Sequence, residues 1–169
     1  MTTIQHAPTA VRCGPTVHRA DTAPNRRRGG DIRVLLSPAS VGATAGFMGT
    51  LTLEPGEVVT EHWHPYSEEY LYCQSGDVLV TLDGEERRLV TESAVHIPIG
   101  VRHRIVNDTA TTATFVFLCG PLAPRPELGH VDTETPPGAR PCARWGGGSS
   151  SRGSAWSRPG RWAARASGT

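Results

Sequence analysis

Short apolar segments separated by turn residues run through the middle of the chain. Hydrophobic and polar residues alternate within them, and no stretch of ten or more residues has the apolar spacing of an amphipathic helix. Asp83-Gly84, between two such segments, is typical of a two-residue β-hairpin turn. The pattern predicts strands at Asp31–Leu36, Gly46–Leu53, Val58–His64, Glu69–Gln74, Val78–Leu82, Glu86–Val90, Ala94–Ile97, His103–Asn107 and Thr114–Cys119. Many short strands at regular spacing indicate an all-β sandwich or barrel, with jelly-roll topology a natural candidate.

The organised region covers residues 24–135, and both ends differ from it in composition. Residues 1–23 mix Thr, Ala, Pro and His without periodicity, so we expect a flexible N-terminal arm. Residues 136–169 contain no Leu, Ile, Val, Met or Phe and include the linker-like run Gly146–Ser151, so we expect a disordered tail. Its arginines and tryptophans suggest either an anion-binding arm or an incidental extension. The central region is long enough to form one domain with its own core.

Charge and composition exclude several functions. Residues 1–135 contain 11 arginines and 16 acidic residues, for a net charge of −5, whereas residues 136–169 carry +6. The overall charge of +1 argues against a nucleic-acid binder. All 17 basic residues are arginine, so Schiff-base and P-loop lysine chemistry are excluded. The apolar runs are too short to span a membrane, no secretory signal is evident and the four cysteines form no CxxC pair, so we expect a cytoplasmic protein with reduced thiols.

A group of potential metal ligands lies in one predicted strand and the segment after it. Residues two apart on a strand share a face, so His62 and His64 point in the same direction and can hold one ion, whereas Trp63 points away. A turn at Pro65–Ser67 then brings Glu69 to the start of the next strand. Two imidazoles and a carboxylate suit a borderline divalent metal.

A second motif supplies another histidine, and the two motifs together resemble the cupin signature. The first fits Gly-x5-His-x-His-x4-Glu-x6-Gly, from Gly56 to Gly76, and the second fits Pro-x-Gly-x-x-His-x-x-x-Asn, from Pro98 to Asn107. Glu92 stands where the second motif usually opens with glycine, and we expect this departure to change the turn geometry. The resemblance implies a single-domain cupin, which is a double-stranded β-helix or jelly-roll barrel, with metal ligands His62, His64, Glu69 and His103.

Further stretches resemble the cupin polyketide cyclases of tetracenomycin-, resistomycin- and spore-pigment-type pathways. They are Pro24–Asp31, Leu35–Met48, His64–Glu69, Gly100–His103 and Pro121–Glu134. The resemblance implies a cytoplasmic, homodimeric, metal-dependent cyclase of aromatic (type II) polyketide biosynthesis. Its metal is expected to be zinc, with iron, manganese or nickel as alternatives. Its expected partners are a polyketide intermediate and an acyl carrier protein or synthase, with neither nucleic acid nor membrane.

Three further features have two interpretations each. His96, two residues before Pro98, either points into the metal cavity as a catalytic base or further ligand, or points outward. Arg26–Arg28 either hold an anionic partner such as an acyl carrier protein or form a solvated basic run. Cys73 is interpreted as a small buried hydrophobe and not as a nucleophile.

The expected reaction is a regiospecific aldol cyclisation with loss of water, in which the metal stabilises an enolate and the cavity walls fix the fold of the poly-β-ketone. An alternative from the same ligand set is a cupin oxygenase that oxidises an aromatic polyketide intermediate. A second alternative is a non-catalytic subunit that stabilises the synthase complex. A sugar isomerase is a weaker third alternative, which an apolar cavity would oppose.

Overall fold

A computed structural model of the chain describes residues 14–137, which include the whole organised region. Its elements are η1 (Arg19–Asp21), β1 (Asp31–Leu36), α1 (Pro38–Val41), β2 (Phe47–Leu53), β3 (Val58–Trp63), β4 (Glu68–Ser75), β5 (Asp77–Leu82), β6 (Glu85–Val90), β7 (Ala94–Ile97), β8 (His103–Val106), β9 (Ala113–Gly120), η2 (Pro126–Leu128) and β10 (Val131–Asp132). The prediction of an all-β fold is confirmed, because the helical elements are only three or four residues long.

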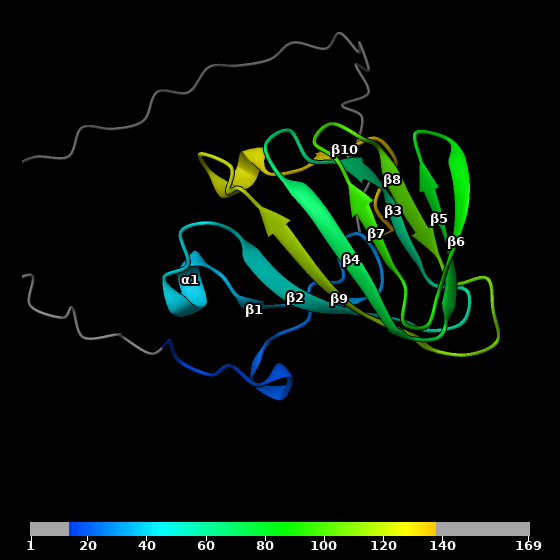
Figure 1. Cartoon of the computed structure of the whole chain (residues 1–169), viewed down its shortest axis with the longest axis horizontal. Coiled ribbons are helices and arrows are strands. Elements are labelled where there is room, and N and C mark those ends of the chain that lie inside the picture. The colour runs from blue at the N-terminus through cyan, green and yellow to red at the C-terminus, as the bar shows by residue number, and fades with distance from the viewer. Residues whose placement is uncertain (1–13, 138–169) are drawn as a thin grey trace, which may run out of the picture.

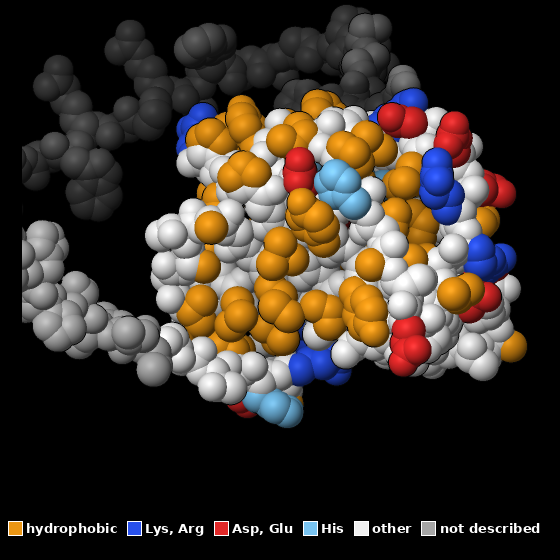
Figure 2. Space-filling view, in the orientation of Figure 1, with side chains coloured by type: hydrophobic (Ala, Val, Ile, Leu, Met, Phe, Trp, Pro, Cys, Tyr) orange, Lys and Arg blue, Asp and Glu red, His pale blue; other side chains and the backbone are white. Residues whose placement is uncertain are grey.

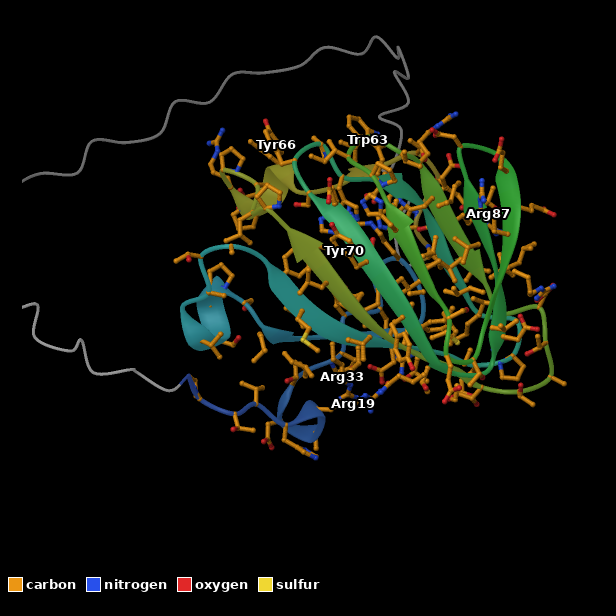
Figure 3. The ribbon with its side chains drawn as sticks, in the orientation of Figure 1. Arg19, Arg33, Trp63, Tyr66, Tyr70 and Arg87 are labelled. Atoms are coloured by element: carbon orange, nitrogen blue, oxygen red, sulfur yellow. The ribbon has the colours of Figure 1, made fainter. Side chains whose placement is uncertain are left out.

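Both predicted flexible ends fall largely outside the described residues. The tail at 136–169 is described only as far as residue 137, and the arm at 1–23 only from residue 14. The described part of the arm includes η1, which the Arg33 guanidinium of β1 holds by donating to the carbonyls of Arg19 and Thr22. Figure 3 shows Arg19 and Arg33 side by side next to this short helix. Within residues 14–137, no helix has the length and apolar character needed to cross a membrane.

The strands form two antiparallel five-stranded sheets that face each other (Figure 1). One sheet has the order β1-β2-β9-β4-β7 and the other β10-β3-β8-β5-β6, so strands adjacent in the sequence often belong to different sheets. This exchange between sheets matches the jelly-roll barrel expected from the strand pattern. It also brings the end of β3 and the start of β8 opposite the start of β4.

Side-chain alternation separates an apolar interior from an outer surface. In β4, Glu69, Leu71 and Cys73 are buried, whereas the intervening Tyr70 and Tyr72 are exposed. The buried core combines residues of both sheets: Leu51, Leu53, Val59, Leu71, Cys73, Val78, Val80, Leu89, Ile105, Ala113, Phe115, Phe117 and Cys119. Burial of Cys73 confirms its interpretation as a small core residue. Burial of this apolar area is the main stabilising contribution to such a fold.

Two turns show how the sequence fixes strand connections. The predicted hairpin between β5 and β6 is present, with Asp83 at φ +46° and Gly84 at φ +89°. Glu92 also has a left-handed backbone, at φ +63°, before β7. The glutamate therefore adopts the conformation that a glycine would adopt more easily, at a cost of about 1 kcal/mol. We expected Glu92 to change the geometry of this turn. The structure instead has the glutamate in a strained left-handed backbone conformation.

The asparagine that ends the second motif has a structural role. Asn107 is fully buried, and its Nδ2 donates to the carbonyl oxygens of Leu53 and Thr111. Its Oδ1 accepts from the backbone N–H of Thr109, and its own N–H donates to Glu57. Because every polar group of this side chain is satisfied, Asn107 ties together the end of β2 and the two loops at residues 54–57 and 107–112.

Candidate metal centre

The four predicted ligands meet inside the barrel, between the two sheets. One potential ligand atom from each of His62, His64, Glu69 and His103 lies within 4.8 Å of the others. His62 and His103 are direct partners in the β3–β8 pairing, and Glu69 reaches them from β4 in the opposite sheet. His64 follows the last residue of β3. All four side chains are buried or nearly buried, so the group lies in the protein interior and is not a surface cluster.

Backbone carbonyls fix the orientation of all three imidazoles. The Nδ1 atoms of His62, His64 and His103 lie 2.8, 3.0 and 3.0 Å from the carbonyl oxygens of Thr60, Gly129 and Val101, respectively. A carbonyl can only accept, so each Nδ1 carries the proton and donates. Each Nε2 of a neutral ring then presents a lone pair to the centre of the group. This support of the distal nitrogen is the usual second layer of a histidine metal site.

The carboxylate of Glu69 lies at the meeting point of two of these lone pairs. Its Oε2 is 3.1 Å from His64 Nε2 and 3.2 Å from His103 Nε2. His103 Nε2 is nevertheless buried without a hydrogen-bond partner of acceptable geometry within residues 14–137. An unsatisfied buried nitrogen facing a carboxylate and two other imidazoles is the environment that a divalent cation would complete. The donor set therefore fits a metal.

Burial and the contacts among these four residues together set the pKa values of the group. Burial and the neighbouring His103 lower the pKa of His62 to about 2. Burial opposes ionisation of Glu69, but contacts with His103 and His64 hold the pKa of its carboxyl well below the usual value. Burial would likewise lower the pKa of His103, but Glu69 raises it above the ordinary value. An ionised carboxylate among imidazoles favours a positive charge at the centre of the group.

An apolar cavity of about 110 Å³ opens beside the four residues. Its apolar walls come from both sheets and are formed by Ile32, Val34, Phe47, Leu51, Val59, Ile105, Phe117 and Cys119. The polar residues on the wall, besides the four candidate ligands, are Asn25, Arg28 and His130. A mostly apolar pocket with a few convergent polar groups suits a largely apolar ligand better than a polyhydroxylated sugar, which opposes the isomerase alternative.

His130 is a cavity residue that sequence reasoning missed. The two-residue strand β10 pairs with β3, with Val131 opposite Trp63 and Asp132 opposite His62. Continuing this register by one residue places His130 on the same side as His64, and their ring centroids are 4.5 Å apart. Burial, with smaller contributions from His64 and Arg28, lowers the pKa of His130 to about 3. A two-residue strand has no recognisable alternation, so no periodic pattern of residues marks it.

His96 lies outside the cavity, which corrects its assignment as the catalytic residue. It is opposite Tyr70 in the β4–β7 pairing, its ring stacks on Tyr70 at 5.0 Å, and it contacts Glu68 on the exposed face. The physical reason is alternation on β7, where Ile97 fills the core and its neighbour must point outward. The outward interpretation of His96 therefore applies.

The arginine run does not form one basic patch. Arg26 is exposed and contacts Asp31 and Glu57, and Arg27 is exposed and contacts Asp132. Arg28 is turned inward, where it contacts Asp132 and lines the cavity. Carboxylates of the same chain thus already contact all three side chains, which weakens the expectation of an acyl carrier protein site there.

Comparison with known proteins agrees with the fold and the motifs. The family model described as "Cupin domain" matches residues 49–119. The "Tetracenomycin polyketide synthase protein TcmJ" of Streptomyces glaucescens is 50% identical over 138 residues, which cover 81% of this chain and 93% of the relative. "Protein SchB" of Streptomyces halstedii is 54% identical over 114 residues, which cover 68% of this chain and 83% of the relative.

Among solved structures, the polyketide cyclase RemF from Streptomyces resistomycificus superposes with a TM-score of 0.58. It is 21% identical, and the match covers 71% of this chain and 85% of RemF, so this similarity concerns the fold. The fold and the two histidine motifs define a cupin. The chain belongs to the cupin family and, within it, to the group that includes the tetracenomycin polyketide synthase protein TcmJ.

Proposed function

We propose that this protein is a metal-dependent cyclase that closes a ring in an aromatic polyketide by aldol condensation and dehydration. The observation that carries the proposal is the convergence of three backbone-oriented imidazoles and one carboxylate on the wall of an apolar cavity. The name of one relative, the tetracenomycin polyketide synthase protein TcmJ, supports the substrate class. The fold shared with RemF is compatible with this chemistry.

The metal would be held by four side chains, those of His62, His64, Glu69 and His103. We propose zinc as the ion, because zinc accepts neutral imidazoles and a carboxylate as ligands. When bound, such an ion supplies Lewis acidity that stabilises negative charge on a ketone oxygen. The carbonyls of Thr60, Gly129 and Val101 keep the three rings oriented toward the ion. The cavity walls would contribute by holding the substrate in place.

The reaction requires a folded substrate and little water. A methylene carbon between two ketones loses a proton and attacks a ketone carbon further along the same chain. The new C–C bond converts that ketone to an alkoxide, which takes up the equivalent of the proton lost by the methylene and becomes a hydroxyl group. This hydroxyl leaves together with a proton from a neighbouring ring carbon, so that one water is lost as the ring aromatises. Side chains such as Val34, Phe47 and Phe117 on the apolar wall would hold the reacting segment in one conformation. Because His96 lies on the outer face of the sheet, we do not propose it as the base.

The outer face of the β1-β2-β9-β4-β7 sheet supports the proposal of a homodimer. Figure 2 shows hydrophobic side chains gathered over β2, β9 and β4. Tyr70, Tyr72 and Leu118 are exposed there, and Figure 3 shows Tyr70 on the outer side of β4. A contiguous exposed apolar patch is typical of a protein–protein contact. Light scattering of the purified protein tests this, and a monomer at micromolar concentration would contradict it.

Metal analysis and product analysis together test the proposed function. The purified protein is expected to contain about one equivalent of zinc per chain and to convert a freshly made poly-β-ketone to one cyclised product without oxygen uptake. Iron, manganese or nickel with oxygen uptake would favour the oxygenase. Metal without any rate enhancement on the isolated intermediate would favour the non-catalytic subunit. Cyclisation at full rate after removal of the metal would contradict the mechanism.

A further inference from the structure

Besides Asn25, two polar side chains on the cavity wall, Arg28 and His130, are not among the four candidate metal ligands. Both line the same cavity as the ligands. Arg28 lies close enough to His103 and His130 to lower the pKa of each. His130 packs against the rings of His62 and His64, with centroids 5.7 and 4.5 Å away. The cavity therefore has a second polar group next to the candidate metal centre.

The backbone holds Arg28 in its inward position. Its carbonyl oxygen accepts from the N–H of Thr60 in β3. The next residue, Gly29, has φ +99°, and a Cβ at this position would lie 1.8 Å from the carbonyl oxygen of Val58. Only glycine allows the chain to approach β3 so closely and turn Arg28 toward the cavity. The side chain of Arg28 is 11% exposed, whereas that of the preceding Arg27 is 61% exposed.

Asp132 links this arginine to the segment that carries His130. Arg28 Nε donates to Asp132 Oδ1, and Arg27 contacts the other carboxylate oxygen. Two guanidinium groups against one carboxylate leave a charge of about +1 at this edge of the cavity. Within residues 14–137, the two terminal nitrogens of Arg28 make no hydrogen bond to another side chain or carbonyl. Their donors are available to a ligand.

We propose that Arg28 and His130 form a subsite for an anionic enolate oxygen of the substrate, next to the oxygen held at the candidate metal centre. This inference rests on the proposed function, because an enolised β-diketone has two oxygens a few ångströms apart. Arg28 supplies a fixed positive charge, and the imidazole ring of His130 supplies an N–H donor. The apolar walls suit the planar carbon framework between the two oxygens. The subsite would stabilise the enolate and fix which carbonyl reaches the metal.

Binding of cyclohexane-1,3-dione tests the subsite. This β-diketone is an enolate at neutral pH, and its oxygens diverge, so it cannot chelate one metal ion. Its affinity is measured by calorimetry on protein loaded with zinc and on protein stripped with a chelator. The Arg28→Gln variant is expected to bind the enolate about 10- to 100-fold more weakly, as for loss of a hydrogen bond to a charged group. His130→Phe, which keeps a ring in place, should weaken binding about fivefold.

Arg27→Gln is the matched control, because Arg27 contacts the same carboxylate from the exposed side. It should change affinity by less than about twofold. The neutral ether 3-methoxycyclohex-2-enone should be insensitive to Arg28→Gln, since it carries no charge. Unchanged thermal unfolding and zinc content would show that the variants fold and keep the metal site.

The outcomes separate this inference from the proposed function. If the Arg28→Gln and Arg27→Gln variants bind the enolate with equal affinity, whether unchanged or equally reduced, the subsite is overturned even if zinc is bound normally. Absence of enolate binding to the wild-type protein in both metal states would also overturn it. A protein that takes up no metal would contradict the proposed function, whereas a selective loss in Arg28→Gln in the stripped protein would still support the subsite.

Discussion

Strand β4 carries two consecutive glutamates, each facing a histidine, and the two pairs lie on opposite faces of the sheet. Inside, Glu69 Oε2 is 3.2 Å from His103 Nε2, with side chains 11% and 1% exposed. Outside, Glu68 Oε2 is 3.4 Å from His96 Nε2, with side chains 40% and 48% exposed. The two pairs have the same chemistry and nearly the same distance. Their surroundings make one a candidate metal centre and the other a surface contact.

The difference lies in what the remaining atoms of each pair face. The Nδ1–H group of the inner histidine donates a hydrogen bond to a backbone carbonyl, and its Nε2 atom faces Glu69 and two more imidazoles. The outer pair is completed by Tyr70, which donates to Glu68, lowers the pKa of that carboxyl and stacks on His96. A solvated ion pair of this kind contributes about 0–1 kcal/mol. A histidine–glutamate pair therefore predicts a metal site only where burial leaves its lone pairs unsatisfied.

Replacing the histidine of each pair should give the largest difference between the inner and the outer pair. We expect the His103→Gln variant to bind the metal roughly 100- to 1000-fold more weakly. This loss corresponds to about one quarter of the binding free energy of a four-ligand zinc site. Cyclisation should be lost with the metal. His96→Gln should retain both. The measurement is elemental analysis with a competitive chelator titration. A His103→Gln protein that loses metal and still cyclises would contradict the mechanism.

The next largest effect concerns packing on the two faces of the same strand. Leu71 is fully buried between the sheets, and Tyr72 is exposed. Leu71→Ala should lower the free energy of unfolding by about 2–5 kcal/mol, because it removes buried apolar volume and leaves a cavity. Tyr72→Ala should change it by less than about 1 kcal/mol in the monomer. Urea unfolding measures both. Similar losses would mean that the outer face is covered as well, for example by a second copy.

Exchanging each glutamate for glutamine gives a smaller and sharper contrast. Glu69→Gln should weaken metal binding by about 10- to 100-fold, since the amide oxygen can still approach the ion but carries no charge. Glu68→Gln should leave metal affinity within about twofold. The same chelator titration measures both variants. Equal losses would show that the two carboxylates do not differ in their access to the metal.

The sequence predicted the sheet well because the turns and alternation are local. Asp31–Leu36 and Ala94–Ile97 are strands with the predicted bounds, and the Asp83-Gly84 hairpin is present. The strand β10 was missed, because its two residues depend on distant partners. Val131 pairs with Trp63, far away in the sequence. Such pairings depend on the three-dimensional fold and leave no periodic trace in the sequence.

The candidate site was predictable where its residues fall within the motifs. The spacing of His62, His64 and Glu69 was sufficient to expect a common centre, and the structure brings them together with His103. The orientation of His96 was ambiguous, because a four-residue strand has too few positions to show which face is buried. His130 reaches the cavity from a segment after the last predicted strand, so local pattern could not place it.

The last prediction compares the acid sensitivity of a buried and an exposed group of the same fold, in protein stripped of metal. Burial lowers the pKa of His130 from about 6.5 to about 3, so between these values the unfolded chain binds a proton that the folded protein does not. His130 therefore destabilises the fold as the pH decreases below 6.5, by up to about 1.4 kcal/mol per pH unit. In contrast, the pKa of Glu68 is lowered from 4.5, so this residue stabilises the fold above 4.5 and loses that effect as the pH decreases further. Urea unfolding from pH 7 to 4 should show His130→Phe gaining stability relative to wild type as the pH decreases, with Glu68→Gln diverging only below about 4.5. Parallel curves for wild type and His130→Phe would mean that His130 is solvated in the folded protein and does not face the apolar cavity.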